Sequence, residues 1–237
     1  LWSESGGQGI DDVWAADLDD DGRDEVIVGY NGSTGLHVFD FDGVRRWKNT
    51  DVGNVWHVTA GDVNGDGQLE VVTTSAGGQV HLFSPDGTPL ANLEMPLYAN
   101  MVRVGPKPAE QSASDGQTIF VVGPGDAGEQ MLAVTGEGTV LWTLELPAAV
   151  NHCDSLWLSP DGQWAAAGLR GGIVAVVDAG HGRLVAQIDG QGQRPDVNWI
   201  VGVNEHSPRL LVATGRALRA FRIDSAAATA ADAADQP

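Results

Sequence analysis

The sequence predicts an all-β repeat protein made of short antiparallel strands, and three observations support this fold class. Short β-rich apolar runs recur along the chain and are separated by turn residues. Glycine is abundant, at 32 of 237 residues, as expected for many tight turns. The runs also form groups of four that recur about every 45 residues, a spacing typical of a propeller blade. We therefore predict a β-propeller of about five four-stranded blades.

The first two units, residues 12–50 and 55–95, align along most of their length. In each unit a strand-like run leads into an acidic loop, and a second strand follows the loop directly. A third strand comes next, at 36–40 in the first unit and 80–84 in the second. An Asp-Gly turn then precedes a fourth strand. This alignment predicts two blades with the same order of strands.

Three later units, at 98–146, 151–190 and 197–224, continue the pattern without the acidic loop. The last has three expected strands, and residues 1–5 resemble a fourth strand. These residues either complete the fifth blade and close the ring, which removes bare sheet edges, or belong to a larger ring of which this chain is a fragment. We expect the Ala-rich residues 225–237 to form a tail or linker outside the propeller of residues 1–224.

The charge of the chain excludes several classes of partner. There are 13 basic and 32 acidic residues, which gives a net charge of −19 and a pI near 4.3. Such a field repels phosphate backbones and anionic surfaces, so we expect no nucleic-acid partner.

No run of 18 apolar residues occurs, so we expect no membrane insertion. The single cysteine, Cys153, lies in an apolar run and is expected to be a buried, inert thiol.

Two acidic loops carry the clearest chemical signal. The first begins at Asp17 and the second at Asp62, and both place carboxylate or amide oxygens at relative positions 1, 3, 5 and 9. Position 6 is glycine in both, which permits a sharp turn. Calcium takes six to eight oxygen ligands at about 2.3–2.6 Å, and alternate side chains of a curled loop converge on one point. We therefore predict two Ca²⁺ sites, the alternative being that both loops are solvated acidic turns.

The expected calcium ligands are side-chain oxygens and, at position 7, a backbone carbonyl. They are Asp17, Asp19, Asp21, Arg23 and Glu25 in the first loop, and Asp62, Asn64, Asp66, Gln68 and Glu70 in the second. An EF-hand would need flanking helices and Glu at position 12, but Val28 and Thr73 stand there, inside β-rich runs. Because the first loop has four carboxylates and the second three, we predict that the first binds calcium more tightly.

These motifs resemble a known family. The stretches Asp17 to Tyr30 and Asp62 to Thr74 resemble the FG-GAP or VCBS-type calcium-loop repeats of integrin-α-like propellers. Residues 41–47 and 138–142 are similar to blade ends of quinoprotein-like (PQQ-like) propellers, and 158–169 resembles a WD40-like blade turn. The FG-GAP resemblance covers about the first 95 residues. It implies a propeller fold, structural calcium, and roles in adhesion or ligand binding. The later units lack the motif, so no metal is expected there.

A second candidate site lies where the predicted first strands begin. In a propeller these starts meet at one mouth of the central channel, where polar and aromatic side chains converge into an ordinary ligand pocket. The candidate ligand-binding residues are Asp12, Trp14, Trp56, His57, Asn100, His152, Asp154, Asn198 and Trp199. The alternative is that the tryptophans wedge between blades and the polar groups cap loops.

We predict a non-catalytic recognition module for a protein or carbohydrate ligand, because GxSxG, HExxH and phosphate-loop motifs are absent. The enzymatic alternative is a polysaccharide lyase or hydrolase using His152 or Asp154, or a quinoprotein-like domain, which the lone Cys153 disfavours. A purely architectural blade set within a longer protein is a third possibility. Weak calcium loops suit millimolar calcium, so we expect an extracellular or periplasmic setting although residue 1 starts no signal peptide. The sequence defines no oligomeric state.

Overall fold

The computed structural model describes residues 2–4, 8–105, 116–126, 128–147, 153–190, 194–200, 208–215 and 217–223, without the side chains of residues 199 and 200. Nineteen strands form five antiparallel sheets, and the described residues contain no helix, so the all-β prediction is confirmed. Accordingly, these residues offer no helix that could cross a bilayer.

The first two sheets each have four strands in simple chain order. The first contains β1 (Ile10–Ala16), β2 (Glu25–Tyr30), β3 (Gly35–Phe39) and β4 (Arg45–Asn49). The second contains β5 (Val55–Gly61), β6 (Glu70–Ser75), β7 (Val80–Phe83) and β8 (Pro89–Leu93). The acidic loops thus join the first and second strands of these two sheets.

The next two sheets also have four strands, and the fifth has three. The third contains β9 (Met101–Gly105), β10 (Thr118–Gly125), β11 (Gly128–Val134) and β12 (Val140–Glu145). The fourth contains β13 (Cys153–Leu158), β14 (Trp164–Leu169), β15 (Ile173–Asp178) and β16 (Arg183–Asp189). The fifth contains β17 (Pro195–Ile200), β18 (Arg209–Thr214) and β19 (Ala217–Arg222). β17 begins at Pro195, two residues before the predicted unit.

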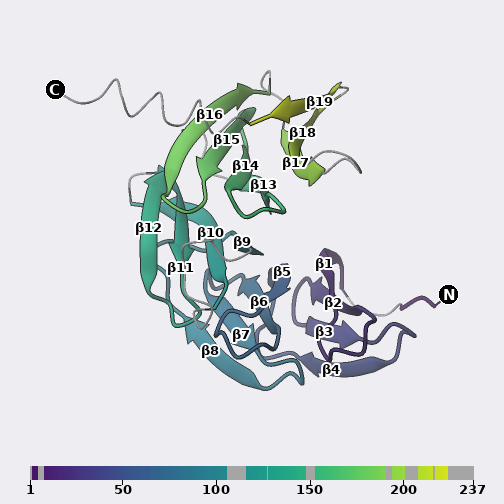
Figure 1. Ribbon diagram of the computed structural model, residues 1–237. Helices are drawn as coiled ribbons and strands as arrows, with labels where there is room; N and C mark the ends of the chain where they lie inside the picture. The colour runs from purple at the N-terminus through teal and green to yellow at the C-terminus, as the bar shows by residue number, and fades with distance from the viewer. Residues whose placement is uncertain are drawn as a thin grey trace.

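Figure 1 shows the five sheets following one another around an arc in chain order, with the first strand of each toward the inside. These inner strands contact one another in sequence: β1 lies against β5, β5 against β9, β9 against β13, and β13 against β17. The starts of strands that are far apart in the sequence are therefore gathered at the centre of the arc.

Hydrophobic side chains fill the spaces between successive sheets. Between the first and second sheets, Ile27 and Val38 pack with Val58 and Phe83, and similar clusters join each later pair. Both faces of the middle strands are buried, as in the wholly buried β6 and β14. Each fully buried large side chain contributes about 1.5–3 kcal/mol, so the contacts between sheets fix the arrangement of the inner strands.

Three tryptophans each donate a hydrogen bond to the turn between the third and fourth strands of a neighbouring sheet. The indole Nε1 of Trp47 donates to Pro85 O of the next sheet (2.8 Å), and Trp142 donates to Ala179 O (3.1 Å). Trp2 makes the equivalent contact with Phe41 O (2.9 Å). Each indole covers a glycine of the turn that it contacts, where a side chain would collide with the ring.

Trp2 therefore occupies, on the first sheet, the place that an outer-strand tryptophan occupies on later sheets. The neighbouring residues 2–4 are not assigned to a strand, and β19 pairs only with β18 in the part of the chain that the structure describes. Closure of the ring by residues 1–5 stays a prediction. The predicted tail, 225–237, lies outside the described residues.

Candidate functional site

The two acidic loops share one backbone scaffold, held by their first aspartate. In the first loop the carboxylate of Asp17 accepts hydrogen bonds from the backbone N–H groups of Asp21 (3.1 Å) and Gly22 (2.9 Å). In the second, Asp62 accepts from Gly65 (2.6 Å) and Gly67 (3.1 Å). The position-6 glycines have φ near +85° and +90°, a conformation that favours glycine.

The last predicted ligand of each loop is a buried glutamate at the start of the second strand. Glu25 and Glu70 are each 2 % exposed. Their Oε2 atoms accept hydrogen bonds from the backbone N–H groups of Leu18 (2.9 Å) and Val63 (3.0 Å). One oxygen of each glutamate thus closes the loop, and Oε1 remains for a cation or another partner inside it.

The first loop concentrates negative charge and also contains a positive side chain. Oxygens of Asp17, Asp19 and Asp21 all lie within 4.8 Å of one another, and no other such group occurs in the described residues. The Arg46 guanidinium is hydrogen-bonded to Asp19 Oδ2 and lies 3.4 Å from Glu25 Oε1. This hydrogen bond holds the pKa of the Asp19 carboxyl below its usual range.

The side chains at position 7 pair with carboxylates at the surface of the first loop or border a cleft. Arg23 pairs with Asp42 (3.4 Å) and Asp21 (3.6 Å) at the loop surface. Gln68 lines a cleft of about 470 Å³ that lies between the first two sheets and is also bordered by Asp19 and Arg46. Neither side chain is therefore needed as a ligand, in keeping with a role for the backbone carbonyl.

In the second loop an amide stands where the first has a carboxylate. Asn64 Nδ2 donates to Asp66 Oδ2 and Glu70 Oε1, both at 3.1 Å, and Asn64 Oδ1 accepts from the N–H of Asp66 (2.8 Å). Burial raises the pKa of the Glu70 carboxyl, and the nearby Asp66 and Asp62 carboxylates add to this shift. No guanidinium contacts this loop among the described residues.

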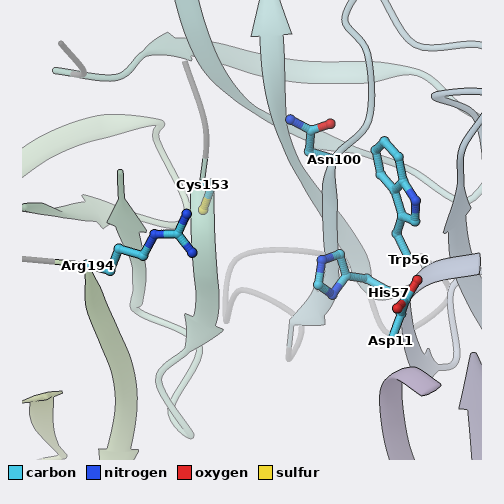
Figure 2. A pocket seen from close by; sticks show the side chains of 6 residues that line it. All are labelled: Asp11, Trp56, His57, Asn100, Cys153 and Arg194. Atoms are coloured by element: carbon cyan, nitrogen blue, oxygen red, sulfur yellow. The ribbon is translucent and has the colours of Figure 1, made fainter. Parts of the chain in front are cut away.

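A central cavity of about 570 Å³ forms the second site (Figure 2). All five sheets contribute to its lining, each from the start of its inner strand or the residue just before it. The lining residues are Asp11, Trp56, His57, Asn100, Cys153 and Arg194. Figure 2 shows Arg194 and Cys153 on one side, Trp56, His57 and Asp11 on the other, and Asn100 between them.

Irregular strand starts aim residues into this cavity. The strand pairing skips one residue at the start of β1, β5 and β13, namely Asp11, Trp56 and Asp154. Such a β-bulge leaves one residue unpaired and redirects its side chain. Asp11 and Trp56 thereby reach the cavity. Asp11 stands beside the predicted Asp12 at the same strand start, but the sequence gives no local signal for the bulge that turns its side chain into the cavity.

A buried ion pair fixes the floor beside the cavity. Asp12 Oδ2 accepts hydrogen bonds from His57 Nδ1 (3.1 Å), Val58 N (3.1 Å) and Arg103 Nη1 (3.2 Å). Burial raises the pKa of the Asp12 carboxyl, but the His57 hydrogen bond and the Arg103 charge outweigh it, so that the pKa is lowered. With Nδ1 donating to Asp12, the Nε2 of His57 remains for a ligand.

Below this pair the centre of the arc is filled rather than open. The rings of Trp14 and Trp157 stack with centroids 5.5 Å apart, although they come from β1 and β13. The Arg103 guanidinium lies over both rings, 5.3 and 5.2 Å from their centroids. Trp14 is thus a packing residue of the centre and does not line the cavity.

The other predicted pocket residues lie elsewhere or outside the described part. Asp154 is bonded to Arg170 Nη2 (3.1 Å), with Arg194 Nε at 3.8 Å. Asn198 is exposed on β17. His152 and the side chain of Trp199 lie outside the described residues. Of the nine predicted residues, the cavity lining contains Trp56, His57 and Asn100.

A buried acid that the sequence did not reveal lies next to Cys153. Glu129 is 1 % exposed and its carboxylate has no side-chain hydrogen-bond partner among the described residues, although the nearby backbone N–H of Cys153 favours its charged form. Burial raises its pKa to about 7. Cys153 is a free, buried thiol whose pKa is raised by burial and by Glu129, and its Sγ lies 3.1 Å from Ser155 O. The prediction of a buried thiol is confirmed.

Comparison with known families bears on the acidic loops. Residues 17–73 match the FG-GAP-like repeat family. The FG-GAP-like segment starts at the first aspartate of the first loop and ends just after the second, so it includes both loops and the strands β2 to β5. The predicted FG-GAP resemblance is confirmed for this segment. A search of curated proteins found no match for the chain.

Proposed function

We propose that this protein is a calcium-binding β-propeller module that recognises a neutral carbohydrate in its central cavity without chemically changing it. The observation that carries the proposal is the convergence of all five sheets on one cavity lined by polar and aromatic side chains. Ligand sites are typically concave, with a few convergent polar groups. The arc of sheets around inner strands and the FG-GAP-like match support the propeller.

Calcium would bind in the two loops and act structurally. The fit is best in the first loop, because opposed oxygens around Ca²⁺ lie about 5 Å apart and three carboxylates already lie within 4.8 Å. The ligands in that loop would be Asp17, Asp19, Asp21, the Arg23 carbonyl and Glu25. In the second they would be Asp62, Asn64, Asp66, the Gln68 carbonyl and Glu70. When bound, the ion neutralises carboxylates that otherwise repel, and an extracellular or periplasmic setting would supply it.

The chemistry of the cavity favours a sugar. Asn100 is 8 % exposed, and its side-chain amide has no partner within the described residues. It offers both a donor and an acceptor, the Nε2 of His57 is free to accept, and Arg194 offers several donors. Neighbouring hydroxyl groups of a sugar both donate and accept hydrogen bonds, so a mixed set of this kind suits them.

An aromatic wall adds the apolar contact that a pyranose ring needs. The Trp56 ring lies 5.7 Å from that of Tyr98 at an angle of 52°, and Tyr98 Oη is bonded to Ala76 O (2.5 Å). This pair holds the indole in a fixed position beside the cavity. The net charge of −19 repels anionic polymers, which favours a neutral saccharide over an acidic one.

The groups that an enzymatic role would use are poorly placed for it. The Cys153 thiol is buried and protonated, and a thiol rather than a thiolate is a weak nucleophile. Asp154 is held by Arg170, 3.1 Å away. These contacts support binding without turnover.

The test is an array of neutral oligosaccharides, followed by titration of each hit with the intact chain in excess calcium and detection by calorimetry. We expect Trp56→Ala to lower the affinity by about tenfold or more, because the stacking surface is lost. Phe41→Ala, an exposed aromatic residue outside the cavity, is the matched control. Binding of peptides but no saccharide would overturn the ligand class, and no binding of either would overturn recognition at this cavity.

A further inference from the structure

We propose that Arg46 is a built-in counter-cation of the first loop, which calcium must displace to bind there. This inference rests on the proposed calcium binding and concerns the residue that sets its strength. Its basis is the position of the guanidinium, which contacts Asp19 and Glu25, two of the expected calcium ligands.

Arg46 reaches the loop from the opposite edge of the sheet. It lies on β4, whereas the acidic loop joins β1 to β2. The pairing of β3 with β4 skips one residue between Val38 and Phe39, and the skipped residue is Arg46. A bulge redirects a side chain, and here the guanidinium extends to the carboxylates while its side chain stays partly exposed.

The contacts make Arg46 a competitor rather than a helper of calcium. Asp19 Oδ2 and Glu25 Oε1 are the atoms on which a cation in the loop would depend, since Glu25 Oε2 is already used by Leu18 N. A guanidinium and Ca²⁺ cannot both have these oxygens, and their like charges repel. The sequence prediction that the first loop binds more tightly counted four carboxylates and no cation.

A cleft beside the first loop can accept the Arg46 side chain when calcium displaces it. Arg46 lines the cleft of about 470 Å³ between the first two sheets, and Asp86 lines the same cleft. Asp86 lies in the turn before β8 and bonds to Ser84 and Thr88, which lowers the pKa of its carboxyl. It is therefore a fixed negative charge toward which the guanidinium moves when calcium enters.

The second sheet contains the same bulge without the charge. Its pairing skips one residue between Leu82 and Phe83, which places Leu90 at the position of Arg46. Leu90 is exposed, and no arginine contacts the second loop among the described residues. The two loops of this chain can therefore be compared directly, because Arg46 contacts the first loop and Leu90 occupies the equivalent position beside the second.

The experiment measures calcium affinity of the first loop alone, by calorimetry in the Asp62→Ala background. We expect Arg46→Leu to raise that affinity about fivefold, the effect of removing one partly exposed ion pair. Arg45→Leu is the matched control, because it removes the same charge from the same strand at an exposed position. It should change the affinity by less than about twofold.

Two readouts separate this inference from the proposed function and from misfolding. A thermal melt in chelator should show lower stability for Arg46→Leu, because Asp19 and Glu25 lose their cation, and calcium should remove the difference. Equal effects of Arg46→Leu and Arg45→Leu, or weaker calcium binding by Arg46→Leu, would overturn the role of Arg46 alone. If the unmodified chain itself binds no calcium, the proposed calcium sites fail as well.

Discussion

The two acidic loops have the same backbone and differ in how their negative charge is balanced. Both are closed by a buried glutamate bonded to the backbone, at Leu18 and Val63. In the first loop two arginines balance the charge, Arg23 within the loop and Arg46 on a distant strand. In the second the balance comes from the Asn64 amide inside the loop and from a raised pKa of Glu70. The repeated motif therefore keeps its backbone geometry, while side chains inside the loop and on other strands differ in how they balance its charge.

The largest expected effect is loss of calcium stabilisation. We predict that Asp17→Ala plus Asp62→Ala abolishes the calcium-induced rise in Tm. Calcium at 100 times its Kd is worth about 2.7 kcal/mol per site. A cooperative melt that still shifts with calcium in the double variant would mean that the ion binds elsewhere.

The single variants sharpen the comparison. Each also loses two backbone hydrogen bonds, a cost of about 1–3 kcal/mol that remains in chelator. For each variant, the loss of unfolding free energy in chelator is subtracted from the loss in calcium. The difference is the stabilisation that calcium provides through that loop. If Asp17→Ala and Asp62→Ala lose the same amount of calcium stabilisation, the two loops do not differ in their response to calcium.

Glu129 extends the comparison to a buried acid that has no ion-pair partner in the part of the chain that the structure describes. Its pKa in the folded state is about 7, against an ordinary 4.5, so its contribution to stability is fully present below about pH 4.5 and is lost as the pH rises through 7. The shift corresponds to at most about 3 kcal/mol. We predict that Glu129→Gln is more stable relative to the natural chain at pH 8 than at pH 5, measured by urea unfolding. A constant difference would mean that Glu129 is ionised throughout.

Glu70 should also lower the stability of the chain as the pH rises, by less than Glu129 does. Its raised pKa means that its contribution is present at low pH and is lost as the pH rises through the folded-state value. In chelator at pH 8, Glu70→Gln should therefore be at least as stable as the natural chain, whereas Glu25→Gln should be less stable because Arg46 loses a partner. The measurement is urea unfolding of both variants, and the opposite order would show that Arg46 does not balance the first loop.

The smallest expected effect is transfer of the counter-cation to the second sheet. Leu90→Arg should stabilise the chain in chelator by about 0.2–1 kcal/mol, the range of exposed ion pairs. Added salt should reduce the gain because such pairs are screened. A gain that persists in 1 M salt would have to arise from packing.

The sequence was sufficient for features that repeat and insufficient for those that depend on how sheets meet. The period of about 45 residues and the Asp-x-Asp-x-Asp-Gly spacing are local, so the β-rich units and the two loops could be predicted. The approach of Arg46 to Asp19 depends on a bulge in β4 and on a sheet edge far away in sequence.

The lining of the central cavity could also be predicted only in part from the sequence. Trp56, His57 and Asn100 were predicted because strand starts gather in a propeller, whereas Arg194 could be found only from the true start of β17. Trp14 was expected in the pocket because it is an aromatic residue near a strand start. It instead stacks on Trp157, a contact between strands that no spacing within the sequence encodes.

The unpaired residues at the starts of the inner strands have a consequence for how such a protein changes over evolutionary time. Asp11 and Trp56 have no partner residue on the neighbouring strand, so a replacement there should disturb strand pairing less than a replacement at a paired position. Under the proposed function, mutations there would alter what the cavity binds, whereas mutations a few residues further along each strand would alter whether the chain folds. On that proposal, ligand preference and stability would diverge independently among descendants of one ancestral chain.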